Sequence, residues 1–349
     1  MTRAERDVAL AGLTTLRVGG PAHTLVTAET TEEVVATLTA CDGAGEPLLL
    51  LGGGSNLVVA DTGFGGTVLA VRTRGFRADF DGDAVRLAVA AGEPWDALVA
   101  RTVAEGWAGL EALSGIPGLT GATPVQNVGA YGCEVAGCVE SVDVLDRATG
   151  ERALWPAATC RFGYRTSIFK QATGEYAVLG VVLQLRRSTV GAPVAYRELA
   201  DRLGVELGET APAAQVREAV LALRRGKGMV LDDADHDTWS VGSFFVNPVL
   251  DAAPAGQLPT DAPRWPLTDG RVKTSAAWLI ERAGFARGFG VELTQGRASL
   301  STKHALAVSN RGGASADDVL QVARMVREGV RTRFGIELEP EPTLVGCHL

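Results

Sequence analysis

Two glycine-rich stretches, LGGGSNLVV at residues 51–59 and SGIPGLTGATPVQNVGAYG at residues 114–132, dominate the organisation of this 349-residue chain. In the first, three glycines follow an apolar segment, residues 48–51, that we interpret as a strand buried on both faces. Glycine permits positive φ angles and lets backbone N–H groups approach a phosphate, and Ser55 and Asn56 add side-chain donors. A tight turn between two strands is the alternative interpretation of this loop.

The second stretch is a long loop whose glycines and prolines make it unsuited to helix or strand. Loops of this length usually carry function or lack order. Its Ile, Val and Tyr residues indicate an ordered path along a flat, partly apolar ligand. Neither stretch is the G-x-G-x-x-G of a dinucleotide-binding βαβ unit, and no P-loop sequence is present. Two separate loops therefore favour a long, bent ligand held between two domains.

The composition is that of a globular chain, with 46% hydrophobic and 21% charged residues. The net charge of −8 disfavours a nucleic-acid partner. The five cysteines form no CxxC pair and the four histidines lie far apart, so we expect reduced thiols and no metal site. There is no apolar signal segment and no run of the ~18–20 apolar residues that a membrane span needs. We therefore expect a cytoplasmic protein without a membrane partner.

Helices and strands alternate irregularly along the chain, which predicts an α+β fold. A capping-box sequence at residues 30–33 starts one helix, and a capped helix begins near Ser315 and ends at Gly335. The other expected elements are strands at 57–60, 67–71, 85–91, 141–145, 176–185 and 336–345, and helices from about Pro94, at 213–225 and at 276–283.

Six segments resemble, in order and spacing, the UDP-N-acetylenolpyruvoylglucosamine reductase family of flavoenzymes. They are TLRVGGPA (15–22), LGGGSNLVV (51–59), SGIPGLTGATPVQNVGAYG (114–132), CRFGYRTSIFK (160–170), VGSFFVNP (241–248) and LEPEPTLVG (338–346), which together cover nearly the whole chain. An insertion after the strand at 176–185 contains Tyr196 and resembles the type I form, whose tyrosine folds over the bound substrate.

The resemblance implies three domains within the α+β class. Two of them would bind FAD as in vanillyl-alcohol-oxidase-like flavoproteins: residues 1–72, and residues 73–230 together with the strand in 335–349. The third, residues 231–334, would bind substrate. It also implies non-covalent FAD, NADPH as hydride donor, and a monomeric enzyme. The expected reaction converts UDP-N-acetylglucosamine enolpyruvate to UDP-N-acetylmuramate in peptidoglycan precursor synthesis.

Reducing an enolpyruvyl ether requires a hydride, which no side chain supplies, and a proton at the neighbouring carbon. The resemblance implies that Arg165 grips the substrate carboxylate, that Ser243 donates the proton, and that Glu341 works protonated at the developing aci-carboxylate. Glu341 is preferred to Glu339 because the family places this residue directly before the last apolar strand. From the residues alone, a surface salt bridge for Arg165 and a buried or capping role for Ser243 would be preferred.

The resemblance also assigns ligand contacts. His304 departs from the family pattern, which often has glutamine there. The cofactor-binding residues expected are Gly52, Gly53, Gly54, Ser55, Asn56, Gly115, Ile116, Pro117, Gly118, Gly121, Gln126, Asn127, Gly129, Ala130 and Tyr131, and the substrate-binding residues are Tyr164, Tyr196, Lys227, Asn247 and His304.

Two other functions stay open. One is an oxidase or dehydrogenase of the same superfamily, with FAD attached covalently through His23 or Cys133. Acid precipitation distinguishes it, because attached flavin stays in a yellow pellet. The other is a non-catalytic regulator that binds a nucleotide sugar, which predicts loss of at least one of Arg165, Ser243 and Glu341; all three are present.

Overall fold

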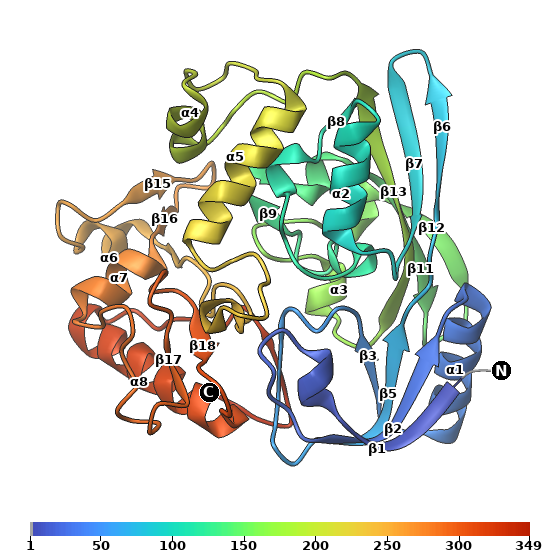
Figure 1. The fold of residues 1–349 in the computed structure, drawn as a ribbon, viewed down its shortest axis with the longest axis horizontal. Helices are drawn as coiled ribbons and strands as arrows, with labels where there is room; N and C mark the ends of the chain where they lie inside the picture. The colour runs from blue at the N-terminus through green and yellow to red at the C-terminus, as the bar shows by residue number, and fades with distance from the viewer. Residues whose placement is uncertain (1–2) are drawn as a thin grey trace. The chain divides into compact units, whose positions relative to one another are not determined.

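The computed structural model describes residues 3–349. Its contacts divide the chain into two compact units, each containing helices and strands (Figure 1). The first unit comprises the chain up to Val8, Ala22–Gly53 and Gly65–Gly226, and the second unit comprises Ala9–Pro21, Gly54–Phe64 and Lys227–Leu349. The mixed content confirms the α+β class, whereas the division into three domains at residues 72 and 230 stays a prediction.

A four-stranded sheet opens the first unit, in the order β1 (Arg3–Ala9), β2 (Pro21–Ala28), β5 (Phe64–Val71) and β3 (Leu48–Leu51). Helix α1 (Thr31–Ala44) packs Val34 and Leu38 against this sheet, and the Thr30 side chain caps its N-terminus as predicted. The prediction that the strand at 48–51 is buried on both faces is wrong. β3 lies at the sheet edge, and three of its four leucines are only partly buried.

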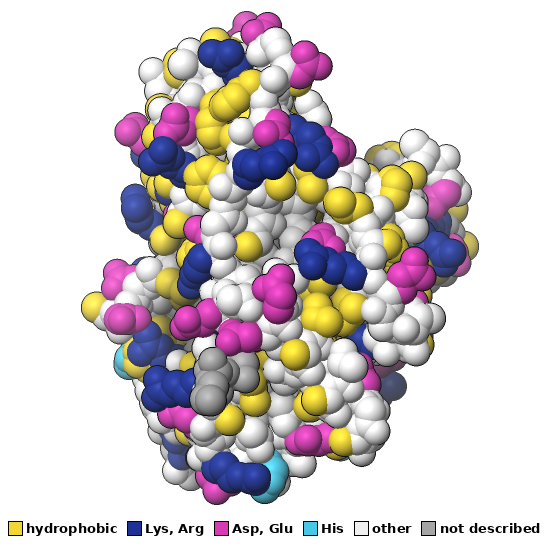
Figure 2. All heavy atoms as spheres, turned by 90° about the vertical axis from the view of Figure 1, so that its right-hand side faces the viewer, with side chains coloured by type: hydrophobic (Ala, Val, Ile, Leu, Met, Phe, Trp, Pro, Cys, Tyr) yellow, Lys and Arg dark blue, Asp and Glu magenta, His cyan; other side chains and the backbone are white. Residues whose placement is uncertain are grey.

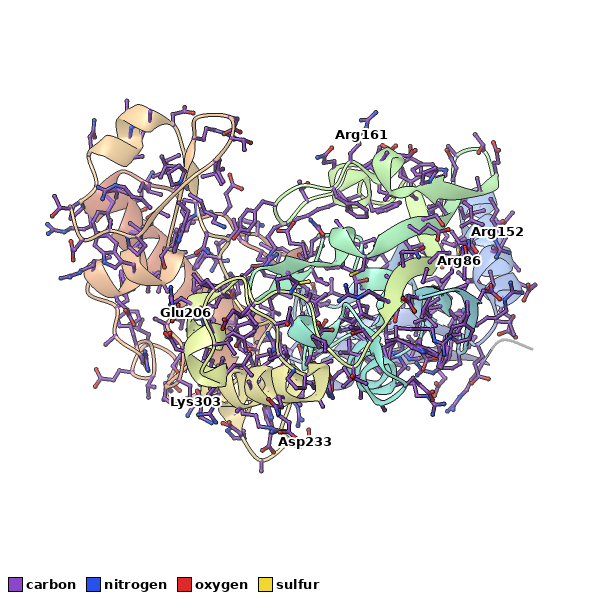
Figure 3. The ribbon with its side chains drawn as sticks, turned by 90° about the horizontal axis from the view of Figure 1, so that it is seen from above. Arg86, Arg152, Arg161, Glu206, Asp233 and Lys303 are labelled. Carbon is purple, nitrogen blue, oxygen red and sulfur yellow. The ribbon has the colours of Figure 1, made fainter. Side chains whose placement is uncertain are left out.

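An antiparallel sheet forms the centre of the first unit. Its order is β12 (Arg152–Pro156), β11 (Val139–Asp146), β13 (Tyr176–Arg187), β7 (Ala84–Ala90) and β6 (Phe76–Asp81), with β8 (Trp107–Ala108) also paired to β13. These bounds confirm the strands expected near 85–91, 141–145 and 176–185. Arg86 on β7 and Arg152 on β12 form ion pairs with Glu140 at 2.8 Å and Asp143 at 2.6 Å (Figure 3).

Helix α2 (Trp95–Ala104) buries Trp95, Leu98 and Val99 in the core of this sheet, with Pro94 as its N-cap. Helix α5 (Ala213–Gly226) lies beside α2 (Figure 1). The remaining elements of the first unit are short: η2 (Glu111–Leu113), η3 (Thr120–Ala122), β9 (Gly129–Ala130), β10 (Cys133–Glu134), η4 (Val135–Gly137), η5 (Ala157–Cys160), α3 (Ile168–Gln171) and α4 (Arg197–Leu203).

The second unit is built around helix α8 (Ala316–Phe334), which packs against α7 (Ala276–Arg282), β17 (Ala298–Leu300) and β18 (Val308–Asn310). Ser315 caps α8 and Gly335 ends it at a φ of 68°, as predicted, and the structure shows that Ser315 and Asp318 form a capping box. Leu16 and Val58, from the two early segments, are part of the same core. The other elements are η1 (Leu10–Leu13), β4 (Leu57–Val59), η6 (His236–Thr238), β14 (Val249–Leu250), α6 (Ala252–Gly256), β15 (Arg264–Pro266), β16 (Val272–Thr274) and β19 (Thr343–Val345).

The C-terminal strand is shorter than expected. Only Thr343–Val345 forms β19, because Pro340 and Pro342 lack the N–H groups that a strand ladder needs. β19 pairs in parallel with β4, and residues 339–341 instead run beside residues 244–246. These contacts lie in the second unit. The expected grouping of 335–349 with residues 73–230 in one FAD-binding domain stays a prediction.

The surface is mixed in character. On the face drawn in Figure 2, Lys and Arg side chains lie interspersed with Asp and Glu. All five cysteines are free thiols. Among the described residues, no helix combines the length and the apolar character needed to cross a bilayer.

Candidate functional site

The three glycines of the first glycine-rich stretch have different surroundings. A Cβ at Gly53 would lie 2.6 Å from the Cα of Gly118, so the two glycine-rich stretches touch within the first unit. A Cβ at Gly54, whose φ is 63°, would lie 2.0 Å from the carbonyl oxygen of Leu13. At Gly52 the nearest atoms would be 3.8 Å away or more, which is ordinary van der Waals contact. The packing of the protein therefore requires glycine at 53 and 54, but not at 52.

Both stretches present backbone donors. In the first unit, the N–H groups of Gly53, Ile116 and Gly118 donate to no acceptor among residues 3–349. Backbone N–H groups that lie inside a protein are normally paired, and successive N–H groups in glycine-rich turns bind phosphate. The donors present therefore fit the diphosphate of the FAD that the sequence led us to expect.

The second stretch follows an ordered path, as predicted. Gly121 donates to the carbonyl of Ala91 at 2.8 Å, and a Cβ at Gly121 would lie 2.5 Å from the Cβ of Ala91. Gly115 donates to Asp96 at 2.6 Å. Burial raises the pKa of Asp96, but hydrogen bonds from Arg217 and Gly115 outweigh this and leave it below its ordinary value. An ionised carboxylate thus fixes the start of the loop.

Asn127 has a structural role within the same loop. Its side chain is almost fully buried, and its amide donates to Glu134 at 2.8 Å and to the carbonyl of Gly163 at 3.0 Å. Its Oδ1 accepts the N–H of Ala136 at 3.0 Å. The amide therefore holds the turn together, and a cofactor contact of Asn127, as of Pro117, Gln126 and Ala130, stays a prediction.

Arg165 is tied to the second glycine-rich stretch. Its guanidinium donates to the carbonyl of Gly129 at 2.7 Å and lies 5.3 Å from the ring centre of Tyr164. Its backbone has a φ of 53°, a left-handed conformation that is uncommon outside glycine. The predicted carboxylate ligand and the predicted cofactor loop are therefore neighbours within the first unit.

The insertion that carries Tyr196 packs on the end of this loop. The rings of Tyr131 and Tyr196 meet edge to face with their centres 5.6 Å apart, and Tyr196 is 45% exposed. A Cβ at Gly132 would lie 2.8 Å from the Cβ of Ala195, so the glycine permits the contact. Burial raises the pKa of Tyr131 to about 12. The ring of Tyr131, predicted as a cofactor contact, thus faces the insertion, a link that the sequence did not reveal.

Ser243 and Glu341 lie on neighbouring backbone segments of the second unit. The N–H of Glu341 donates to the carbonyl of Phe244 at 2.9 Å, and the amide of Asn56 donates to the carbonyl of Glu341 at 3.2 Å. The Ser243 hydroxyl is partly exposed and has no hydrogen-bond partner among the described residues. This serine therefore neither caps a helix nor lies in the core, the two structural roles that the residues alone had suggested for it.

The predicted substrate contacts of the second unit occupy different local settings. Asn247 accepts the N–H of Ala276 at 2.9 Å through Oδ1, at the start of α7. Lys227 is the first residue of this unit's last segment and is partly buried. His304 lies in the loop between β17 and β18. Their contacts with substrate stay predictions.

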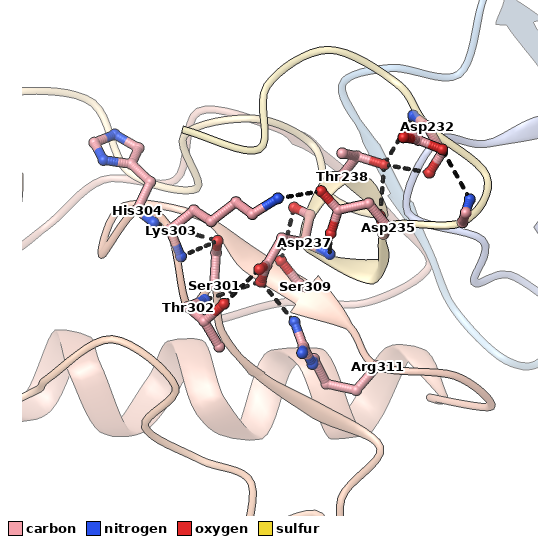
Figure 4. A network of polar contacts seen from close by, with 11 residues as sticks. Asp232, Asp235, Asp237, Thr238, Ser301, Thr302, Lys303, His304, Ser309 and Arg311 are labelled. Carbon is pink, nitrogen blue, oxygen red and sulfur yellow. Dashed lines mark hydrogen bonds and ion pairs between the residues drawn. The ribbon is translucent and has the colours of Figure 1, made fainter. Parts of the chain in front are cut away.

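Sequence analysis missed a buried carboxylate that binds Thr302, two residues before His304. Asp237 is 4% exposed and accepts hydrogen bonds from Thr302 and Arg311 (Figure 4). The signal in the sequence, acidic residues just before SVGSFF, cannot be distinguished from a solvated acidic turn. Only the fold shows that residues 65 positions apart meet here.

Comparison with known proteins gives matches over both halves of the chain. The model described as UDP-N-acetylenolpyruvoylglucosamine reductase, C-terminal domain, matches residues 233–345, and an FAD binding domain model matches residues 22–153. The reductase of Cutibacterium acnes is 53% identical over 98% of this chain and 90% of its own length. That of Saccharopolyspora erythraea is 54% identical over 98% and 95%.

A solved structure agrees with these matches. The crystal structure of UDP-N-acetylenolpyruvylglucosamine reductase from Thermus caldophilus has a TM-score of 0.66 and 27% identity, and the match covers 99% of this chain and 100% of that one. The chain therefore belongs to the UDP-N-acetylenolpyruvoylglucosamine reductase family.

Proposed function

We propose that this FAD-dependent oxidoreductase uses NADPH to reduce the enolpyruvyl group of UDP-N-acetylenolpyruvoylglucosamine, giving UDP-N-acetylmuramate for peptidoglycan synthesis. Family membership supports the reaction and the FAD-binding match supports the cofactor. The observation that carries the proposal is the partly exposed, unpartnered hydroxyl of Ser243, one residue from the backbone bond that joins Phe244 to Glu341.

FAD, once reduced by NADPH, would supply a hydride to the methylene carbon of the substrate. Ser243 then delivers a proton to the carbon that bears the oxygen and the carboxylate, so the double bond gains one hydride and one proton. A serine hydroxyl is a weak acid and protonates only a strongly basic, enolate-like carbon. Arg165 binds the substrate carboxylate, because a guanidinium stays charged and can grip it bidentately. Glu341, protonated, donates to the carboxylate as negative charge develops on it.

Backbone groups and a few side chains provide binding in this proposal. The N–H groups of Gly53, Ile116 and Gly118, all in the first unit, hold the FAD diphosphate. Tyr164, Tyr196, Lys227, Asn247 and His304 bind the nucleotide sugar; Asn247 uses Oδ1 on α7, which leaves its amide donors for ligand. We also propose a cytoplasmic monomer, and the five free thiols support a reducing compartment.

Anaerobic half-reactions test the proposal. NADPH should bleach the flavin and the enolpyruvyl nucleotide sugar should restore its colour. Ser243→Ala should leave bleaching unchanged and slow reoxidation by roughly 10²–10⁴-fold, the usual contribution of a general acid. Ser275→Ala, which removes a helix cap in the same unit, is the matched control and should reoxidise at the wild-type rate. Wild-type reoxidation by Ser243→Ala would show that another group donates the proton.

Acid precipitation addresses the covalent alternative. Burial raises the pKa of the Cys133 thiol to about 12, which disfavours the thiolate that attachment to flavin needs. We expect free FAD in the supernatant. A yellow pellet would instead favour attachment and an oxidase-like activity.

A further inference from the structure

A buried carboxylate organises the loop that carries His304. Asp237 accepts the N–H of Thr302 at 2.9 Å and its hydroxyl at 2.5 Å, and Arg311 donates to the same carboxylate at 2.5 Å (Figure 4). Lys303, the next residue of the loop, forms an ion pair with Asp235. Two acidic residues of one turn therefore hold consecutive residues of the loop.

The contacts continue from Thr302 to His304. Ser301, fully buried, accepts the N–H groups of Lys303 at 3.0 Å and His304 at 3.3 Å through its hydroxyl. The carbonyl of His304 accepts the N–H of Ala307 at 3.1 Å. The backbone of His304 is thus fixed on both sides, while its partly exposed side chain extends from the loop (Figure 4).

The same loop supports the segment that carries Ser243. Leu306 accepts the N–H of Phe244 at 2.7 Å, and Ser240 pairs with Ser309 in an isolated bridge. Asp237 precedes this segment on the same stretch of chain. His304 lies only two residues from Thr302, so a displacement of Thr302 should reach it directly. The segment that carries Ser243 is held in addition by the backbone contacts of its neighbours Ser240 and Phe244.

The charge of Asp237 matters to these contacts. Burial raises its pKa, but the hydrogen bonds from Thr302 and the charge of Arg311 outweigh this and hold the pKa below its ordinary value. An ionised carboxylate is acceptor-only and can take all three donors, whereas an amide in its place would bring its own N–H groups against them. An isosteric change should therefore release the loop without removing bulk.

We infer that Asp237 is a positioning residue, which holds the Ser301–His304 loop through Thr302 and so sets the affinity for the nucleotide sugar. It takes no part in hydride or proton transfer. The inference rests on the proposed function, because that function assigns His304 to the substrate. It extends substrate recognition to a residue that touches no ligand.

The test compares Asp237→Asn with Asp318→Asn in the FAD-loaded enzyme. Asp318 is a comparable carboxylate of the second unit, 7% exposed and paired with Arg297 at 2.8 Å. It lies on α8 and accepts hydrogen bonds from Arg297 and Ser315 rather than from the Ser301–His304 loop. Binding of UDP-N-acetylenolpyruvoylglucosamine to oxidised enzyme is followed by the change in flavin absorbance. We expect Asp237→Asn to raise Kd about tenfold, the scale of one lost charged hydrogen bond, and Asp318→Asn to leave it unchanged.

Two further readouts separate positioning from chemistry. In Asp237→Asn, KM should rise with Kd, while kcat at saturating substrate and the rate of bleaching by NADPH stay within about twofold of wild type. Thr302→Val keeps the backbone donor and loses the hydroxyl, so its Kd should rise about threefold, the scale of one weak neutral hydrogen bond.

Several results would overturn the inference. They are an unchanged Kd in Asp237→Asn, an equal rise in Asp318→Asn, or a fall in kcat without a rise in KM. If Asp237→Asn does not fold, an unchanged Kd in Thr302→Val overturns it. Failure of the proposed function is recognised separately, because the wild-type enzyme would then bind FAD yet show no response to the nucleotide sugar.

Discussion

The contrast between Gly52 and Gly53 allows a sharp test of the cofactor site. We consider Gly52→Ala and Gly53→Ala, which add the same methyl group to adjacent residues. At Gly52 the new Cβ meets Ala122 at 3.8 Å and Leu119 at 3.9 Å, and the φ angle is one that L-residues adopt. At Gly53 it lies 2.6 Å from the backbone of Gly118. If a ligand is the reason for glycine at 52, the two variants must differ.

The distances set the expected magnitudes. Gly52→Ala should stabilise the FAD-free protein by about 0.4–1 kcal/mol, because alanine reduces the entropy of the unfolded chain at a compatible site. Gly53→Ala should destabilise it by about 1–3 kcal/mol, the usual cost of overpacking. Both should weaken FAD binding: Gly52→Ala because the methyl group occupies ligand space, Gly53→Ala because the two stretches separate.

The assay is urea denaturation of FAD-free protein, combined with FAD titration by flavin fluorescence. The informative outcome is Gly52→Ala, in which stability and FAD affinity should move in opposite directions. Wild-type FAD affinity in Gly52→Ala would refute the assignment of this glycine to the cofactor. Loss of stability to the same extent as in Gly53→Ala would refute the packing argument.

Two further predictions concern carboxylates outside the proposed chemistry. Hydrogen bonds from Arg297 and Ser315 lower the pKa of Asp318 from 3.8 to about 2, so Asp318→Asn should cost about 2 kcal/mol at pH 7 in urea denaturation. Because the folded pKa is the lower one, that difference should persist above pH 4 and shrink as the pH falls through 2; a pH-independent difference would contradict this origin. Glu111, 2% exposed, accepts the N–H groups of Gly109 at 2.7 Å and Ala192 at 2.6 Å. Glu111→Gln should cost about 1–3 kcal/mol and increase protease cleavage within residues 190–212; wild-type protection there would show that other contacts hold the insertion.

Features that depend on near neighbours in the chain were predictable. The capped start of α8 at Ser315 and its end at Gly335 follow from sequence alone, because a helix end is fixed by a few adjacent residues. The burial of the strand at 48–51 was not predictable, because burial depends on where the strand lies in the sheet, and this strand lies at the edge. The last strand was predicted to be longer than it is, because its apolar pattern was given more weight than the two prolines of LEPEP.

The candidate site shows the same division. The glycine loops could be predicted from glycine's own conformational freedom. The roles of Arg165, Ser243 and Glu341 follow from the resemblance and stay predictions. The Gly53–Gly118 contact, the Tyr131–Tyr196 pair and the Asp237 network could not be predicted, because each joins residues far apart in the chain. The local pattern of a sequence does not show which distant residues come into contact in the fold.

The discontinuous make-up of the second unit has a consequence for biosynthesis. Strand β4, at Leu57–Val59, pairs with β19 at Thr343–Val345, and Leu16 and Val58 belong to the core that α8 completes. During translation these early segments leave the ribosome long before their partners are made, whereas the first unit is complete once Gly226 has emerged. The nascent chain must therefore keep two apolar segments from aggregating until its final residues appear. A stop codon just before β19 would release a protein whose second unit cannot close.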